Sequence, residues 1–348
     1  MTETRYVTMC MLPQPATSNS SYTWSARMNA KRVGDMCLVA LCSLLATTRP
    51  ARPPLVLVNQ HTLATLGPKL QRLGAQPLLA PPLPSWNMTG SMWVTRPKKL
   101  RAASAPERTY SFHKLSLWDP ALTGERRLAF FDADALFVRS GAALADVRAP
   151  AALPSDFHCG DAAGTQEYPG IMREPHGGIV VNGRRIAKAG YYFNSGTTCV
   201  RAHAPRFPAH PHAFGSRVTG VMVFEPSRDV HAELMRTYLS GDYKVTDVDF
   251  GKFGEQDVLQ NVYWRLLGGA RPHRLPDEFN FRGYKCNLAR ANLSAVAIIH
   301  RQPSDSHAPK TRHSLLLQAC GGRADWHGRM IDLVSRSQCT GPVRSCTD

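Results

Sequence analysis

The eleven-residue stretch LAFFDADALFV (128–138) constrains the fold of this chain more than any other segment. Its apolar, aromatic first part predicts a buried strand over Leu128–Asp132, and a second apolar run follows at 135–138. Two carboxylates, Asp132 and Asp134, stand where the strand ends. Buried carboxylates are costly unless they are paired, hydrogen-bonded or bound to a cation, and two of them one residue apart can share a hard divalent ion. The stretch therefore favours a metal site that bridges nucleotide phosphates, with two solvated acids as the plainer alternative.

The first third of the chain predicts a parallel sheet covered by helices. Its apolar strands do not alternate with polar residues, as is typical of strands buried on both faces. Helical patterns lie between the strands, and the polar segment 13–32 is predicted as a loop. In order, we expect a strand at Arg5–Leu12, a helix at Asp35–Leu45, a strand at Pro54–Asn59, a helix at His61–Leu73 and a strand at Gln76–Ala80.

The rest of the chain adds two strands and polar groups near their ends. Strands are predicted at Val218–Glu225 and Ala295–His300, whereas 141–190, rich in Ala, Gly and Pro, is predicted as loop and short helix. His300 closes the last strand, and we favour a metal ligand over an ordinary core histidine because ligands gather at the carboxyl ends of parallel strands. Lys114, on a short helix before the acidic strand, would neutralise phosphate or else be a solvated helix residue.

Composition limits the classes of partner. The 348 residues fit one large domain or two small ones, and the net charge of +16 favours phosphates and other anions. The sequence has no long run of Lys and Arg with interleaved aromatic residues, so we expect no nucleic-acid partner. No stretch approaches 18 apolar residues, and the amino terminus lacks a secretory pattern, so we expect no membrane span and a cytoplasmic location. The sequence leaves both a monomer and a homodimer open.

The nine cysteines form no CxxC pair. Their odd number and scatter predict mostly unpaired thiols in a reducing compartment, with Cys339 and Cys346 as the one pairing that the spacing suggests.

Two further polar clusters suggest a substrate site. Aromatic residues lead into an Asn194-Ser195-Gly196 turn, where a glycine lets the backbone approach a ligand and the side chains could bind sugar hydroxyls; a plain turn is the alternative. Glu255, Gln256 and Asp257 open a helix, where capping alone would also explain acidic residues.

Nine short segments follow one another over residues 5–310: YVT (6–8), CSLL (42–45), LVLV (55–58), HKLSLW (113–118), FFDAD (130–134), FNSG (193–196), GVMVFEPS (220–227), GEQDVLQ (254–260) and IIH (298–300). In this order they resemble family 8 of the glycosyltransferases, the group that contains glycogenin, galactinol synthase and bacterial lipopolysaccharide galactosyltransferases.

The resemblance implies a GT-A fold, in which a Rossmann-like, mostly parallel twisted sheet is flanked by helices in a single domain. We expect that domain over residues 1–315, with a carboxyl-terminal extension at 316–348. The implied activity is that of a retaining hexosyltransferase that uses Mn²⁺ (or Mg²⁺). Its donor would be a nucleotide sugar, usually a UDP-sugar, and its acceptor a hydroxyl of a glycan, a polyol or a protein.

Matching positions give each site residue an expected role. The metal ligands would be Asp132, Asp134 and His300. The donor site would add Thr8 beside the nucleobase, Lys114 and Lys310 near the phosphates, and Ala133 between the two acids. Asn194, Ser195 and Gly196 would contact the transferred sugar. The reacting face would be lined by Glu255, Gln256 and Asp257.

The sequence departs from the family pattern in several places, and Glu255-Gln256 stands where the family usually has an Asp-Gln pair. FNSG and GVMVFEPS are separated by 197–219, so either an insertion follows FNSG or Val218-Thr219-Gly220 is its true equivalent; we prefer FNSG, because Val218 cannot replace an amide. No glycine follows His300, and Lys310 is the nearest basic match. Two other functions stay open: a catalytically weak relative that binds nucleotide sugar or glycan, and a metal-dependent nucleotidyltransferase, whose glycine-rich, basic phosphate loop the sequence lacks.

Overall fold

A computed structural model describes most of the chain. The described residues are 3–12, 23–83, 111–154, 171–173, 179–181, 184–187, 217–240, 255, 258–259, 262–263, 273–281, 292–300, 326–336 and 339. None of the helices within these ranges combines the length and the apolar character that a membrane crossing requires.

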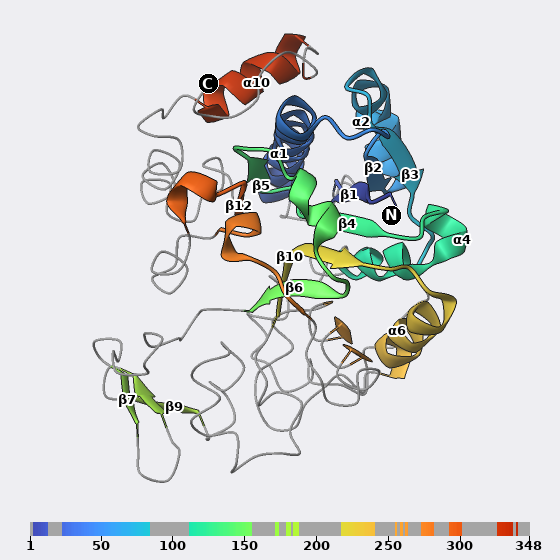
Figure 1. Cartoon of the computed structure of the whole chain (residues 1–348). Coiled ribbons are helices and arrows are strands. Elements are labelled where there is room, and N and C mark those ends of the chain that lie inside the picture. The colour runs from blue at the N-terminus through green and yellow to red at the C-terminus, as the bar shows by residue number, and fades with distance from the viewer. Residues whose placement is uncertain are drawn as a thin grey trace.

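A seven-stranded sheet forms the centre of the molecule (Figure 1). Its order is β11-β6-β10-β4-β1-β2-β3, and β3, β2, β1 and β4 run parallel, whereas β10 is antiparallel to both β4 and β6. This mostly parallel sheet, flanked by helices, confirms the fold class expected for a GT-A protein. The strands are β1 (Arg5–Cys10), β2 (Leu55–Val58), β3 (Gln76–Leu79), β4 (Leu128–Phe131), β6 (Ala151–Pro154), β10 (Arg217–Phe224) and β11 (His273–Arg274).

Alternate residues of the central strands feed two hydrophobic cores, one on each face of the sheet. Ala129 and Phe131 of β4 pack on the face that is covered by α1 (Thr23–Thr48), α2 (Gln60–Arg72) and α10 (Trp326–Arg336). Leu128 and Phe130 pack on the opposite face, under the 3-10 helix η3 (Phe112–Trp118), the short helix α4 (Pro120–Thr123) and α6 (Arg228–Ser240). Burial on both faces explains why β2 and β4 are apolar throughout, as predicted.

Two smaller sheets complete the described elements. β5 (Ala135–Phe137) pairs antiparallel with β12 (Ile298–His300), which brings His300 opposite Ala135. β7 (Ile171–Arg173), β8 (Ile179–Val181) and β9 (Arg184–Ala187) form an antiparallel sheet. Three 3-10 helices connect other elements: η4 (Ala142–Asp146), η7 (Asp277–Phe279) and η8 (Leu293–Ala295).

Two predicted loops are wrong in part. α1 begins at Thr23, twelve residues before the predicted start at Asp35, because its first turns are polar but contain no proline or glycine to stop the helix. The segment 141–190 includes β6 as well as β7, β8 and β9. β6 has little strand character of its own, and it forms because it lies between β10 and β11 in the sheet.

The predicted cysteine pairing is also wrong. Cys339 forms a disulfide with Cys42 of α1, 297 residues away in the sequence, rather than with Cys346. The packing of α10 on α1 brings the two sulfurs together, which spacing along the chain does not reveal. Cys10 and Cys37 are buried free thiols, as expected for most of the cysteines.

Candidate metal centre and donor site

The acidic turn lies at the carboxyl end of β4, next to the carboxyl end of β1. These two strands meet where the strand order reverses, because β2 and β3 follow on one side of β1 and β4 lies on the other. Open α/β sheets bind their ligands in the crevice outside such a reversal. The chain turns sharply there, since the Ala135 amide donates to the Asp132 carbonyl over 2.9 Å. The turn leaves the side chains of Asp132 and Asp134 partly exposed.

Three side chains converge at this turn. His300 Nε2 lies 3.6 Å from Asp132 Oδ2 and 3.4 Å from Asp134 Oδ1, and one ligand atom from each residue fits within 4.8 Å of the other two. The β5–β12 pairing produces this arrangement, because it carries His300 back to the turn that precedes β5. The structure therefore brings together the three residues that the sequence proposed as metal ligands.

Asn280 orients the imidazole. His300 Nδ1 and Asn280 Oδ1 are 2.7 Å apart, and both side chains are buried. The amide oxygen only accepts hydrogen bonds, so this contact is satisfied when the proton is on Nδ1, which leaves the Nε2 lone pair facing the carboxylates. Asn280 is held in place by its neighbour Phe281, whose amide donates to the Ile298 carbonyl and whose carbonyl accepts from the His300 amide.

Gly220 of β10 provides the space for the histidine. A Cβ atom at this position would lie 1.8 Å from His300 Cε1, so no larger residue fits beside the ring as it stands. The Gly220 carbonyl also accepts a 2.7 Å hydrogen bond from the Asp132 amide. One glycine thus contacts the backbone of one candidate ligand and the side chain of another.

Lys114 lies between two carboxylates. Its ammonium group is 3.0 Å from Asp132 Oδ1 and 3.0 Å from Glu255 Oε1, and it lies over the ring of Phe130 at 4.5 Å. Burial alone would lower the pKa of Lys114, but the two carboxylates outweigh it and raise that pKa above its ordinary value. Lys114 is therefore charged, and Asp132 divides its oxygens between Lys114 and the side that faces His300.

Three carboxylates act on one another at this site. Desolvation raises the pKa of Asp132; Lys114 and His300 oppose this shift, and the negative charges of Asp134 and Glu255 both add to it. A divalent cation between the acids would relieve both the desolvation and the repulsion.

The three side chains fit a six-coordinate hard cation. Neighbouring ligand atoms around such an ion are about 3 Å apart when each metal–ligand distance is about 2.1 Å. The separations of 3.4 and 3.6 Å from Nε2 are a few tenths of an ångström wider, so a small contraction would bring Nε2 and each oxygen to the spacing of neighbouring ligands. Oxygen-rich ligand sets suit Mg²⁺ and Mn²⁺, and one imidazole is compatible with a transition metal.

The other predicted site residues fall into two groups, those that the structure describes and those outside the described residues. Thr8 of β1 is fully buried, and its hydroxyl finds no hydrogen-bond partner among the described residues. Ala133, between the acids, packs against the core under α1. Glu255 is buried with its carboxylate on Lys114. Outside the described residues lie Asn194, Ser195, Gly196, Gln256, Asp257 and Lys310.

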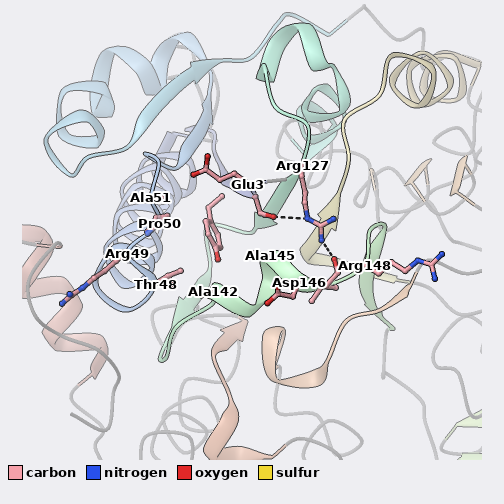
Figure 2. Close-up of a pocket in the computed structure, with 13 residues that line it drawn as sticks. Glu3, Thr48, Arg49, Pro50, Ala51, Arg127, Ala142, Ala145, Asp146 and Arg148 are labelled. Carbon is pink, nitrogen blue, oxygen red and sulfur yellow. Dashed lines mark hydrogen bonds between the residues drawn. The ribbon is translucent and has the colours of Figure 1, made fainter. Parts of the chain in front are cut away.

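A separate cavity of about 550 Å³ lies at the other end of the sheet (Figure 2). It opens beside Thr4, which precedes β1, and Arg127, which precedes β4, so it is remote from the acidic turn. Arg127 donates to Thr4 and to the Val147 carbonyl, whereas Figure 2 shows Arg49 and Arg148 pointing in opposite directions. These guanidinium groups do not converge on one point, so the cavity presents no anion site.

The sequence missed two contributors to the candidate metal centre. Gly220 carried a signal, because a lone glycine inside a strand pattern often marks a close approach of another group. From the sequence, Gly220 was considered only as part of the alternative sugar-contact turn Val218-Thr219-Gly220. Asn280 carried none, since an asparagine after a short helix is ordinary.

Comparison with known proteins finds distant likenesses among solved structures. No family model matches the chain, and no curated protein matches it. Among solved structures, it is similar to the apo form of WbbM, described as a bifunctional glycosyltransferase, with 13% identity, a TM-score of 0.47 and coverage of 95% of this chain and 51% of that one. The apo glycosyltransferase GlyE of Streptococcus pneumoniae TIGR4 matches with 12% identity, a TM-score of 0.45 and coverage of 96% and 64%.

The galactosyltransferase LgtC, in complex with donor and acceptor sugar analogues, matches with 12% identity, a TM-score of 0.47 and coverage of 95% of both chains. This chain spans about half the length of WbbM and less than two thirds of GlyE. These structural neighbours are glycosyltransferases, but likenesses of this strength do not assign an activity to this chain.

Proposed function

We propose that this chain is a metal-dependent, retaining glycosyltransferase of family 8. It transfers a hexose from a nucleotide sugar, with a UDP-sugar as the first candidate, to a hydroxyl of a glycan, a polyol or a protein. One observation carries the proposal: Asp132, Asp134 and His300 converge at the strand-order reversal of a mostly parallel sheet.

Such a centre suits the departure of a nucleoside diphosphate. A divalent ion held by the three side chains would neutralise the diphosphate as negative charge develops on it. The net charge of +16 favours the approach of an anionic donor. Lys114 would keep Asp132 ionised while one carboxylate oxygen faces the ion. The same lysine is 3.0 Å from Asp132, close to where phosphate oxygens would lie.

The finer roles rest on the sequence resemblance. It supports the choice of Mn²⁺, retention of anomeric configuration and UDP as the carrier. It also supports sugar contacts by Asn194, Ser195 and Gly196 and a reacting face that includes Gln256 and Asp257. Lys310 would close over the phosphates, and Thr8 would lie beside the base. The proposed catalytic domain covers 1–315, and α10 of the extension packs on its core.

A donor panel tests the function. The full chain is incubated with Mn²⁺ and each of several UDP-hexoses, with glycan, polyol and protein acceptors, and products are identified by mass spectrometry. We expect UDP release together with transfer of the sugar, and loss of both on addition of EDTA. Release of pyrophosphate would instead indicate a nucleotidyltransferase, and donor binding without turnover would indicate a binding relative.

Substitution of the acids tests the site. Asp132→Ala and Asp134→Ala should each abolish Mn²⁺-dependent turnover while the circular dichroism spectrum stays that of a folded protein, because the turn itself is held by backbone bonds. Arg336→Ala, on the exposed side of α10, is the matched control and should keep full activity. Retention of more than a few per cent of activity by either acid variant would contradict the assignment.

The cytoplasmic location stays a prediction, and the Cys42–Cys339 disulfide counts against it. Such bonds persist mainly in oxidising compartments, whereas cytosolic thiols are kept reduced. Thiol-specific alkylation of the protein in its source cells, followed by mass spectrometry of the Cys339 peptide, distinguishes the two locations: an alkylated Cys339 supports the cytoplasm.

A further inference from the structure

We propose that α10 helps to position the metal ligands, and that Trp326 of α10 and Ser43 of α1 are positioning residues for strand β5. The proposal rests on the metal site proposed above. It assigns a role to α10, on which none of the three candidate ligands Asp132, Asp134 and His300 lies.

Strand β5 has one partner strand and two side-chain partners. In the part of the chain that the structure describes, β5 pairs with β12 alone. On its other edge, the Phe137 amide donates to Ser43 Oγ over 3.0 Å, and Trp326 Nε1 donates to the Phe137 carbonyl over 3.0 Å. Ser43 is itself fixed, because its hydroxyl donates to the Ala40 carbonyl. Two side chains therefore take the place of a neighbouring strand.

The position of β5 sets the geometry of the ligands. Asp134 directly precedes β5, and the ladder places Ala135 opposite His300 and Phe137 opposite Ile298. A displacement of β5 would therefore change the 3.4 Å separation between Asp134 Oδ1 and His300 Nε2. Metal–ligand distances tolerate shifts of only about 0.2 Å, so the affinity for the ion should respond to small movements of this strand.

α10 is itself held firmly. Trp326, Met330 and Val334 recur at every fourth position and pack into the core shared with α1 and β5. The Cys42–Cys339 disulfide ties Cys339, which follows α10, to α1 at the position next to Ser43. Two adjacent residues of α1 thus have complementary contacts: Ser43 holds β5, and Cys42 holds the segment that presents Trp326.

The disulfide offers a reversible perturbation. A dithiol reductant would transfer two electrons and two protons to the two sulfurs, giving two protein thiols and the oxidised, cyclic form of the dithiol. Reduction should loosen α10 from α1, weaken the Trp326 contact and lower the affinity for Mn²⁺. Reoxidation should restore that affinity.

The first test measures binding of Mn²⁺ alone by electron paramagnetic resonance, which reports free Mn²⁺ and does not depend on turnover. Trp326→Phe removes the indole donor and keeps an aromatic ring, and Ser43→Ala removes the hydroxyl. Each variant should raise the Kd for Mn²⁺ about 10-fold, as outer contacts of metal ligands commonly do. Leu70→Ala is the control, because Leu70 lies in the same core on α2 and belongs neither to β5 nor to β12. It should lower the thermal midpoint and leave the Kd unchanged.

Hydrogen exchange of the metal-free protein provides the second test. In both variants, and after reduction, the amides of 135–138 and 298–300 should exchange faster, whereas those of β2 should not. If the variants lose thermal stability but bind Mn²⁺ like the wild type, the contacts are merely structural and the proposal is overturned. If wild-type protein itself fails to bind Mn²⁺, the proposed function fails instead, and unchanged exchange in 135–138 would separately refute the bracing of β5.

Discussion

Gly220→Ala should disrupt the candidate metal centre, although Gly220 is not itself a metal ligand. The added methyl group would lie 1.8 Å from Cε1, 2.3 Å from Nδ1 and 2.6 Å from Nε2 of His300. Ordinary van der Waals contact begins near 3.4 Å, so the imidazole must move by about 1.6 Å. That is several times the tolerance of a metal–ligand bond, and Nε2 would leave its position facing Asp134.

The cost to stability has two parts. Overpacking a filled site costs about 1–3 kcal/mol. Moving the ring also breaks its bond to Asn280, and leaving those buried polar atoms unpaired costs about 1–3 kcal/mol more. We therefore expect the free energy of unfolding to fall by about 2–6 kcal/mol. Loss of one of three ligands should weaken Mn²⁺ binding by roughly 100-fold, which is the upper end of the effect of removing a residue that hydrogen-bonds to a metal ligand.

Urea denaturation and Mn²⁺ titration of four proteins would measure these effects: wild type, Gly220→Ala, His300→Ala and the double variant. Because His300→Ala removes the ring that the methyl would strike, the two changes should be non-additive by about 1–3 kcal/mol. Gly328→Ala is the matched control, because its methyl would meet nothing within 4 Å. If Gly220→Ala binds Mn²⁺ like the wild type, the imidazole is not a ligand in the position described.

Two further predictions concern the partners of the ligands. Lys114→Met should lower stability by about 3–5 kcal/mol at pH 7, because Asp132 and Glu255 lose their shared cation. Without that charge the pKa of Asp132 rises further above its unfolded value, so the folded form then favours protonation and the deficit should shrink as the pH falls towards 4; urea unfolding between pH 4 and 8 measures this, and a constant deficit would contradict it. Asn280→Ala should raise the Kd of His300-dependent Mn²⁺ binding about 10-fold, whereas Asn280→Asp, which keeps an acceptor, should restore it in the same titration.

The sequence predicted the part of the fold that local pattern determines. β2 and β4 are apolar throughout because each is buried on both faces, and such runs are recognisable without any tertiary information. The acidic turn was recognisable for the same reason, since carboxylates after such a strand require compensation. His300 followed from the rule that ligands gather at strand ends.

What the sequence did not predict depends on contacts between distant segments. β6 acquires its strand conformation from β10 and β11, and Cys339 acquires its partner from the docking of α10. His300 lies near the acids because β12 pairs antiparallel with β5. From the sequence, His300 was instead expected at the end of a strand of the parallel sheet. Lys114 illustrates the same limit, because its pairing with Glu255 joins residues 141 positions apart.

The disulfide between Cys42 of α1 and Cys339 closes residues 42–339 into a covalent ring. That ring contains Asp132, Asp134 and His300. A protease that cuts once at any peptide bond between residues 42 and 339 therefore opens the ring without releasing a fragment. The nicked protein would run at its full mass on a non-reducing gel, and it would separate into two pieces only after reduction. Intactness on such a gel is consequently no evidence of an uncut backbone, and a purified sample of this protein should be judged on reducing gels.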